Sequence, residues 1–474
     1  MVLTMVRSTK NTFASINRIP PEVLSLIPDY FETGEELIKL THVCRSWREI
    51  FISRASLWTF VDCANPDKTS VYIQRSKGSP LNVSFMIRAH THYRDPAFRL
   101  TIPHISRFKA LTLCGHQCII ASLTKYLASS APLLEKLKLQ VDDVDSRTTV
   151  RDTLFDGDFS SLRELRLSGI LTYLPWKNLS NLTKFSFRHV PNWLTVTQFL
   201  DFFEQAPRLR EIALQDSLPH SSNAPAERVV LLPHLSLLDI LAEPSPSTLL
   251  NHLHIPTGAW VTLGFQFTDR ILDYLPRSLD NLNNISHITY INLDFDFGMD
   301  AYFEGPSGGF NAIGTLPDYR LASPVDDHLL LSINKLPIST TETLRIKWLE
   351  TPANPGVEKS AAYQMLLLMN GLRTLVLVNC LNLPLAFALN PGCNTSNTVV
   401  CPKLEKLFLC DPDQEEEFCI DELLEMAKAR AAGGAKLSTI VIICPLELIS
   451  AEKVSNLRDY ASHAEHRPDY GPYR

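Results

Sequence analysis

The stretch Leu134-Glu135-Lys136-Leu137-Lys138-Leu139 is followed 28 residues later by Leu162-Arg163-Glu164-Leu165-Arg166-Leu167. Apolar residues occupy the first, fourth and sixth positions of both phrases, and charged residues stand between them. The ending of each phrase has the two-residue period of a β-strand with one buried face. The phrase therefore predicts a short strand that packs its leucines against a core.

The same phrase returns along the chain at a regular interval. Its middle apolar residue falls at positions 83, 111, 137, 165, 185, 212, 238, 263 and 288, in steps of 20 to 28 residues. After a gap of 56 residues it falls at 344, 375, 407 and 440. Units of about 20–29 residues, each contributing one strand, are typical of leucine-rich repeats. Strands that return at such spacing, with helices between them, predict parallel pairing in an α/β fold.

Two of the stretches between phrases carry clear helix signals. Thr195 and Gln198 form a capping-box pattern ahead of an apolar run. Near the C-terminus, the acids at 415–417 precede an apolar pair, two bases and Gly433-Gly434. This order favours a helix, because acids suit its first turn, bases its last turn and glycine its C-cap.

The region from 64 to 458 thus resembles an irregular leucine-rich-repeat array. Only Leu372-x-x-Leu375-x-Leu377-x-x-Cys380 also carries the residue that ends the family's core motif. The resemblance implies a solenoid with a curved parallel sheet. The stretch from 294 to 340 fits no clean unit, and its glycines between 305 and 309 predict a protruding loop insertion.

The N-terminal segment has a different, helical pattern. Residues 1–14 are polar and predict a flexible lead-in, and prolines at 20–21 suit the first turn of a short helix that ends at Pro28. A second helix is predicted over 35–51, because its apolar residues recur at intervals of 3, 3, 1, 3 and 4. A strand is predicted at 57–61. Helices this short bury little surface alone, so the segment is expected to need a partner.

Three motifs follow one another in this segment. They are Ile19-Pro20-x-Glu22-Val23-Leu24, Leu40-x-x-Val43-Cys44-Arg45-x-Trp47 and Leu57-Trp58. Together they resemble an F-box over residues 15–63, most closely those of basidiomycete fungal F-box proteins. The resemblance implies docking on a Skp-family adaptor, and through it on a cullin. The residues expected to bind the adaptor are Ile19, Pro20, Val23, Leu24, Ile27, Leu37, Leu40, Val43, Cys44 and Trp47.

Composition and charge narrow the possible functions. The chain of 474 residues is 45% apolar and 20% charged, with a net charge of −6, as in ordinary globular proteins. It shows no basic stripe of the kind that nucleic-acid-binding domains carry. Its longest apolar runs fall short of the ~20 residues that a membrane helix needs, and its ten cysteines form no C-x-x-C pair. We therefore expect no nucleic-acid or membrane partner, and a location in the cytoplasm or nucleus.

Several short motifs match catalytic or metal-binding patterns without the surroundings that the chemistry needs. Gly305-Pro306-Ser307-Gly308-Gly309 matches G-x-S-x-G, but its proline predicts a turn and not the end of a strand. Asp296-Phe297-Gly298 lacks the other kinase motifs, and the acids of 294–300 lack the glycine and glutamate of a calcium loop. The Cys-x-His-x-Cys at 114–118 lacks further zinc ligands. We therefore expect no enzyme activity, no cofactor and no metal.

The sequence predicts four regions: a flexible N-terminus (1–14), an F-box (15–63), a repeat array (64–458) and a C-terminal tail (459–474). The resemblance implies the substrate-recognition subunit of a Skp–cullin–F-box (SCF) ubiquitin ligase, whose repeats bind an unidentified target protein. One alternative is a non-catalytic repeat scaffold without a ligase role. Another is an N-terminal helical hairpin that packs on the rest of the chain and has no outside partner. Within the F-box interpretation, an alternative role for some of the listed residues, Trp47 especially, is in the module's internal core.

Overall fold

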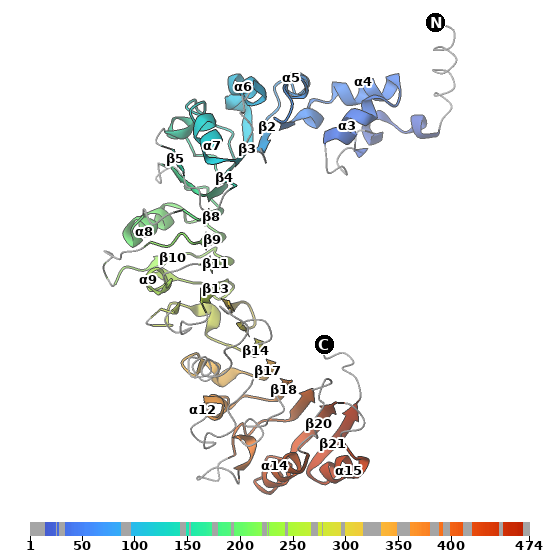
Figure 1. Cartoon of the computed structure of the whole chain (residues 1–474), viewed down its shortest axis with the longest axis vertical. Coiled ribbons are helices and arrows are strands. Elements are labelled where there is room, and N and C mark those ends of the chain that lie inside the picture. The colour runs from blue at the N-terminus through green and yellow to red at the C-terminus, as the bar shows by residue number, and fades with distance from the viewer. Residues whose placement is uncertain are drawn as a thin grey trace. The chain divides into compact units, whose positions relative to one another are not determined.

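A computed structural model shows that the chain divides into two compact units. The first comprises Met1–Trp193 with Gln205–Leu209, and the second comprises Leu194–Glu204 with Arg210–Arg474. Both are mixed α/β, with mostly parallel sheets (Figure 1). The residues that the structure describes are 15–24, 26–27, 34–86, 96–142, 148–150, 153–172, 179–190, 194–219, 225, 227–241, 245–266, 274–276, 278–294, 299–315, 333–347, 361–379, 388–391, 399–410, 420–444 and 449–467.

The first unit has a sheet whose described strands all pair in parallel. These strands are β1 (Phe60–Asp62), β2 (Leu81–Met86), β3 (Phe108–Gly115), β4 (Lys136–Val141), β6 (Glu164–Ser168) and β8 (Lys184–Arg188). The connections contain α5 (Pro66–Arg75), α6 (Pro96–Thr101), α7 (Gln117–Thr124), η4 (Ile102–Arg107) and η5 (Leu154–Gly157). A separate small sheet pairs β5 (Thr148–Val150) with β7 (Ile170–Thr172).

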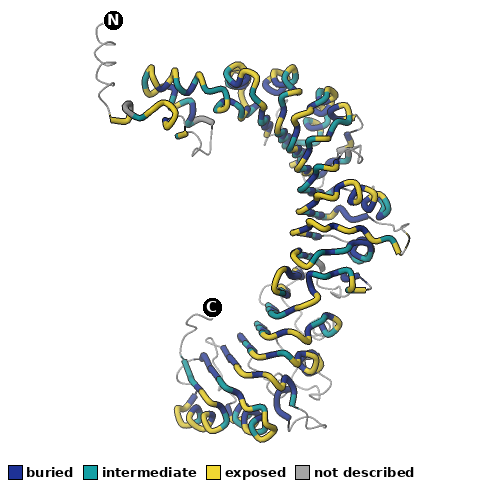
Figure 2. The backbone as a smooth tube through the Cα atoms, turned by 180° about the vertical axis from the view of Figure 1, so that it is seen from behind, coloured by how far each residue is buried: buried dark blue, intermediate teal, exposed yellow. Residues whose placement is uncertain are grey.

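The register of the first sheet aligns the middle residues of the leucine phrases. Val83 lies opposite Leu111, and Leu111 lies opposite Leu137. Leu165 and Phe185 continue the same row on the next two strands. All five side chains are at most 2% exposed, and Figure 2 shows buried residues alternating with more exposed ones along the strands. The strands predicted from the phrases in this unit are confirmed, and their apolar residues form its core.

The sheet of the second unit is longer and mostly parallel. In spatial order its strands are β9 (Glu211–Gln215), β11 (Leu237–Leu241), β13 (Trp260–Gln266), β16 (Gly309–Thr315), β15 (Met299–Glu304), β14 (Tyr290–Asp294), β17 (Thr343–Lys347), β18 (Thr374–Val378), β19 (Lys406–Cys410), β20 (Leu437–Ile443) and β21 (Ala461–Arg467). Its helices are α8 (Val196–Gln205), α9 (Ser247–Leu250), α12 (Ala361–Leu368), α14 (Ile420–Ala432) and α15 (Ala451–Tyr460). Helices α14 and α15 cover one face of β20 and β21 (Figure 1). We call the opposite face of this sheet the second face.

A hairpin interrupts the parallel order of the second sheet. Strands β15 and β16 pair antiparallel with each other and stand between β13 and β14. The prediction of a protruding loop over 294–340 is therefore wrong for 299–315, whereas 316–332 lie outside the described residues. A Cβ atom on Gly308 would collide with the carbonyl oxygen of Thr257. The glycines are thus needed because the turn of the hairpin passes close to neighbouring backbone, and not because the segment is a loop.

Two predicted phrases have a different register in the structure. Leu238 lies opposite Val261, so the middle residue of that unit is Val261 and not the residue at 263. Ile291 lies opposite Leu344, so the middle residue of the next phrase is Ile291 and not the residue at 288. That phrase therefore spans 288–293. Overlapping apolar residues fit both registers in each case. The pairing with neighbouring strands decides between them, and a periodic pattern does not contain that information.

The helix signals in the second unit are confirmed where the structure describes them. The backbone N–H of Thr195 donates to Gln198 Oε1 at 2.9 Å, and the N–H of Gln198 donates to Thr195 Oγ1 at 3.3 Å, which completes the capping box of α8. Gly434 follows the end of α14 with φ +77°. This left-handed backbone favours glycine, as predicted for the C-cap. The acids at 415–417 lie outside the described residues.

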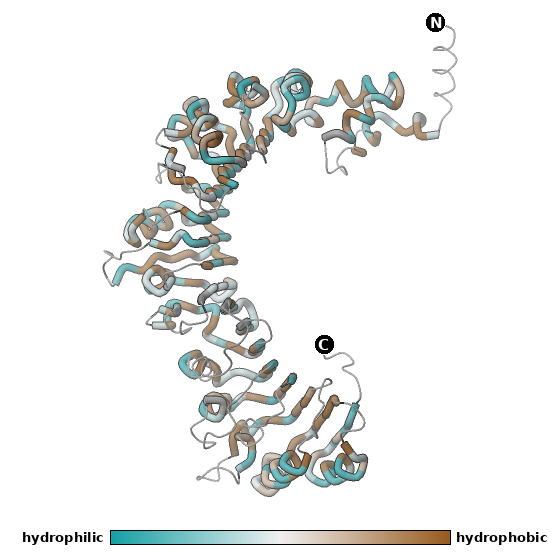
Figure 3. Tube along the Cα trace, in the orientation of Figure 1, coloured by the Kyte–Doolittle hydropathy of each residue, from teal (hydrophilic) through white to brown (hydrophobic). Residues whose placement is uncertain are grey.

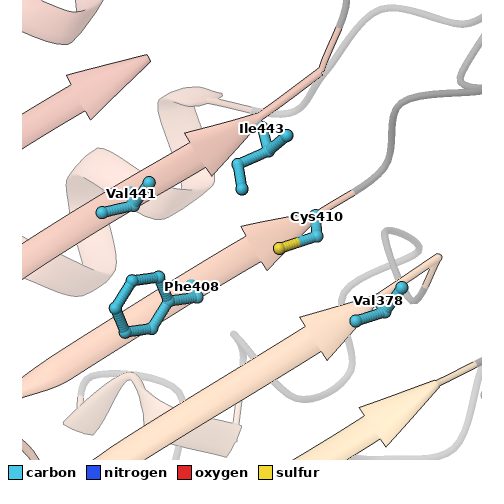
Figure 4. Close-up of a cluster of buried hydrophobic side chains, with 5 residues drawn as sticks. All are labelled: Val378, Phe408, Cys410, Val441 and Ile443. Atoms are coloured by element: carbon cyan, nitrogen blue, oxygen red, sulfur yellow. The ribbon is translucent and has the colours of Figure 1, made fainter. Parts of the chain in front are cut away.

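The second face becomes apolar towards the C-terminal edge of the sheet. A cluster of side chains at most 6% exposed lies there on β18, β19 and β20 (Figure 4). It consists of Val378, Phe408, Cys410, Val441 and Ile443. Burial raises the pKa of the Cys410 thiol to about 11, and Figure 3 shows hydrophobic residues concentrated along these strands. These strands are therefore stabilised by apolar contacts on both faces.

A fully buried arginine connects α14 to the segment before β19. Arg430 donates from Nη1 to the carbonyl oxygens of Val400 at 2.7 Å and Leu389 at 3.4 Å, and from Nη2 to that of Cys401 at 2.9 Å. Its side chain is 0% exposed, and this burial lowers its pKa. The guanidinium thus gives hydrogen-bond donors to three carbonyl groups in the interior of the unit.

Replacing Arg430 with alanine is expected to lower the free energy of unfolding of this region by at least about 3 kcal/mol, because each of its three buried acceptors that loses its donor costs ~1–3 kcal/mol. Hydrogen exchange of peptides from α14 and β19 measures this loss as faster exchange. Lys428→Ala is the matched control, since Lys428 is exposed on the same helix. Equal protection of these peptides in both variants would contradict the stabilising role of Arg430.

Candidate protein-interaction site

The N-terminal segment folds into short helices that pack on one another. They are η1 (Ser15–Arg18), α2 (Pro21–Leu24), α3 (Gly34–Thr41), α4 (Arg45–Ser53) and η3 (Ala55–Trp58). The sequence predicts one helix over 35–51, but the chain turns at 42–44 and forms α3 and α4 instead. The single helix is therefore a wrong prediction, although its apolar stripe does lie on helices.

Local contacts explain the break between α3 and α4. Cys44 has an extended backbone, with φ −157° and ψ 174°. Arg48 Nε donates to the carbonyl oxygen of Thr41 at 2.8 Å, and the hydroxyl of Thr41 donates to the carbonyl oxygen of Ile38 at 2.7 Å. These bonds satisfy carbonyl groups in the last turn of α3, so the helix ends without a glycine or proline.

Part of the predicted adaptor-binding set forms the core of this helical module. Leu24, Leu37 and Trp47 are at most 6% exposed, and Phe51 is 0% exposed. The rings of Trp47 and Phe51 meet edge to face, with centroids 5.7 Å apart. Leu24, Leu37 and Trp47 therefore stabilise the module from within, and their contact with an adaptor stays a prediction.

Other members of the predicted set lie at the surface. Val23 is 51% and Val43 is 55% exposed, and Pro20 is also exposed. Ile19, Ile27, Leu40 and Cys44 are partly buried. Large apolar side chains that remain so exposed on a small module mark a surface that another molecule can cover.

Two exposed apolar residues of the module were not predicted. Ile16 and Leu26 are each 47% exposed. Leu26 lies three residues after Val23, and its backbone N–H donates to the Val23 carbonyl oxygen at 3.1 Å. Leu26 could have been predicted from the sequence, because its helical spacing places it on the same side as Val23. Ile16 could not, because it precedes the first helix motif.

The module is joined to the sheet of the first unit by Trp58. This residue is 0% exposed, and its indole Nε1 donates to the carbonyl oxygen of Phe51 at 2.8 Å. The Tyr72 ring meets the indole edge to face at 4.9 Å, and the Arg75 guanidinium lies 4.3 Å from the ring centroid. The predicted strand at 57–61 is thus only partly correct, because its first two residues belong to η3.

Strand β1 then follows directly and pairs in parallel with β2. The helical module and the sheet are therefore continuous through both side-chain packing and backbone pairing. A compact set of short helices with a buried core and exposed apolar residues belongs to the class of protein-docking modules. Residues 16–64 match the family model described as F-box-like, so this segment is an F-box-like domain. Domains of this family generally bind Skp-type adaptors.

The match covers 49 of the 474 residues and leaves the sheets of both units outside it. A comparison with curated proteins found no significant match. The resemblance to leucine-rich repeats and to basidiomycete proteins therefore stays a prediction.

The motifs examined for chemistry have structural roles where they are described. The Nδ1 atom of His116 accepts the backbone N–H of Cys118 at 3.5 Å at the start of α7, and Cys114 Sγ donates to Asp142 at 2.9 Å. The G-x-S-x-G sequence forms the turn between β15 and β16. Among the described residues, no group of three or more His, Cys, Asp or Glu side chains is placed to hold a metal ion. No helix in the described part of the chain is long and apolar enough to cross a membrane.

Proposed function

We propose that this protein is the substrate-recognition subunit of an SCF-type ubiquitin ligase. The F-box-like domain docks on a Skp-family adaptor and through it joins a cullin. The remaining strands and helices form an irregular leucine-rich-repeat solenoid that binds a target protein. The protein itself catalyses no reaction, and it acts in the cytoplasm or nucleus.

The exposed apolar side chains of the F-box-like domain carry this proposal. Val23 and Val43 are more than half exposed, although the domain has its own buried core of Leu24, Trp47 and Phe51. Burying a fully exposed valine contributes about 1.5–3 kcal/mol, so covering one of these half-exposed valines contributes about 1 kcal/mol. An adaptor that covers these residues therefore gains binding energy without disturbing the fold of the domain.

The aligned leucine phrases support the proposal for the rest of the chain. Leu344, Leu375, Leu407 and Ile440 lie opposite one another on successive parallel strands. In a stack of this kind each unit buries its apolar residues against the next. The second face of β18, β19 and β20 is buried as well, so we place the side chains that bind partners on the second face of other strands. Holding a target near a charged ubiquitin-transfer enzyme raises the local concentration of target lysines without any catalytic residue in the receptor.

Complex formation between the purified full chain and a purified Skp-family adaptor tests this proposal. A 1:1 complex in size-exclusion chromatography that also retains a cullin is the expected result. A full chain that is folded by circular dichroism, but forms no adaptor complex at micromolar concentrations, would contradict the ligase role. That outcome would favour the second candidate, a non-catalytic repeat scaffold, which the long sheet of the second unit also supports.

A further inference from the structure

Three aromatic side chains lie together on the second face of the second sheet. Trp260 on β13 stacks on Tyr302 of β15, with centroids 5.2 Å apart and planes 27° apart. Tyr290 on β14 meets Tyr302 edge to face at 6.2 Å. All three are partly exposed, although the residues that follow them in their strands, Val261, Ile291 and Phe303, are buried on the other face. Trp and Tyr side chains are enriched among the residues that carry most of the binding energy of protein interfaces.

The inserted hairpin creates this arrangement. Gly309 of β16 lies opposite Trp260, and a Cβ atom at Gly309 would lie 2.5 and 2.7 Å from two atoms of the indole. The indole therefore lies across the backbone of β16 and reaches the ring of Tyr302 on the next strand. A side chain larger than hydrogen at 309 would displace it. The glycine and the hairpin together bring the rings of Trp260, Tyr302 and Tyr290 side by side.

Acidic side chains surround these rings. On β15 the second face carries Glu304, Tyr302 and Asp300, so the tyrosine stands between two carboxylates. Asp300 lies opposite Asp294 of β14, and burial together with the charge of Asp294 raises the pKa of Asp300. Two carboxylates this close favour a cation between or beside them.

The second-face positions of these four strands include no basic residue within the described parts of β13, β14, β15 and β16. They are Trp260, Thr262, Gly264, Gly309, Asn311, Ile313, Glu304, Tyr302, Asp300, Tyr290, Asn292 and Asp294. The nearest cations on this face belong to β17, where Lys347 Nζ lies 3.3 Å from Asp294 and Arg345 Nη1 donates to Asn292 Oδ1 at 3.2 Å. Asp300 and Glu304 remain beside the aromatic rings without a lysine or arginine on their own or adjacent strands.

We propose that the aromatic acidic patch, formed by Trp260, Tyr290, Tyr302, Asp300 and Glu304, binds a basic segment of the target protein. An arginine or lysine side chain lies on the exposed aromatic faces and pairs with the carboxylates. This proposal rests on the proposed function, because it names the target class of the same receptor. Charge complementarity decides the occupant, since Asp300 and Glu304 stand on either side of Tyr302 on β15, whereas Arg345 and Lys347 lie beyond β14 on β17. The aromatic faces add a cation–π contact, which suits arginine particularly.

A random dodecapeptide display library panned on the purified full chain tests this inference. The peptides that bind are expected to be enriched in arginine and lysine, with affinities that weaken as salt rises. Their dissociation constants are expected to rise at least tenfold for Asp300→Lys and for Trp260→Ala. Asp300 is exposed and only partly desolvated, and the core residues of β15 are Ala301 and Phe303, so its replacement should leave the packing of the strand intact.

The matched control is Glu452→Lys, which makes the same change of charge at an exposed position on α15. Basic peptides should bind it as they bind the wild type. The inference would be overturned if the library yielded acidic or neutral peptides, or no binding peptide at all. It would also be overturned if the selected basic peptides bound Asp300→Lys as tightly as the wild type. Adaptor binding measured on the same variants separates the two proposals, because Asp300→Lys should retain it. A wild-type chain that binds no adaptor would overturn the ligase role, but it would not contradict the binding of basic peptides to the patch.

Discussion

Replacing Val23 and Val43 together with aspartate is expected to weaken binding of the Skp-family adaptor at least ~100-fold. Each aspartate would be buried in the interface as an unpaired charge, which costs more than the apolar contact that it removes. Losses of ≥ 2 kcal/mol, or about 30-fold, are typical of single changes at the centre of an interface. Isothermal titration calorimetry with the purified adaptor measures the change.

Because these two valines are exposed, the double variant tests adaptor binding without disturbing the fold of the domain. Both side chains are more than half exposed, so the aspartates are solvated in the free protein and the fold should persist. Leu24 and Trp47 are unsuitable, because their replacement would disrupt the core of the domain. Leu231→Asp is the matched control, since Leu231 is a 65% exposed leucine of the second unit. An adaptor affinity within threefold of wild type for the double variant would place the docking surface elsewhere.

Replacing Trp58 with alanine is expected to lower the free energy of unfolding of the F-box-like domain by about 3–5 kcal/mol. The change removes a fully buried indole, its hydrogen bond to Phe51, and its contacts with Tyr72 and Arg75. It leaves a cavity between the helices and the first strands of the sheet. Hydrogen exchange across α4, η3 and α5 should become faster, and adaptor affinity should fall with it.

Trp58→Phe separates the ring from its hydrogen bond. Phenylalanine keeps an aromatic ring against Tyr72 and Arg75 but leaves the Phe51 carbonyl without its donor. A smaller loss, of about 1 kcal/mol, is therefore expected. If the alanine variant exchanged as slowly as wild type, Trp58 would not be what joins the domain to the sheet.

The strands of the first unit could be predicted from sequence because each leucine phrase has one buried face. Leu137 and Leu165 follow the same pattern and lie opposite each other, as equal spacing predicts. The hairpin could not be predicted in this way. Its core positions include small residues such as Ala301 and Ala312, which lack the leucine signal. Their antiparallel pairing depends on neighbours that are distant in the sequence.

In the helical module, too, the apolar pattern predicted part of the structure and not the rest. The apolar stripe predicted helices, but its intervals fit one continuous helix as well as two. The contact from Arg48 to the end of α3 decides between them, and it forms only in the folded chain. The stripe also places Val43 and Trp47 in one set, although one is exposed and the other buried. Periodicity identifies apolar residues, whereas tertiary packing decides which of them stay at the surface.

The pairing of β1 with β2 has a consequence for how far a bound target lies from the adaptor. Because the F-box-like domain ends in the first strand of the sheet, its position is set by strand pairing and not by the length of a tether. Neighbouring strands advance by about 4.8 Å, so each step through the first unit moves a binding position by a fixed increment. Under the proposed function, the strand that holds the target would therefore set which target lysines come within reach of the ligase.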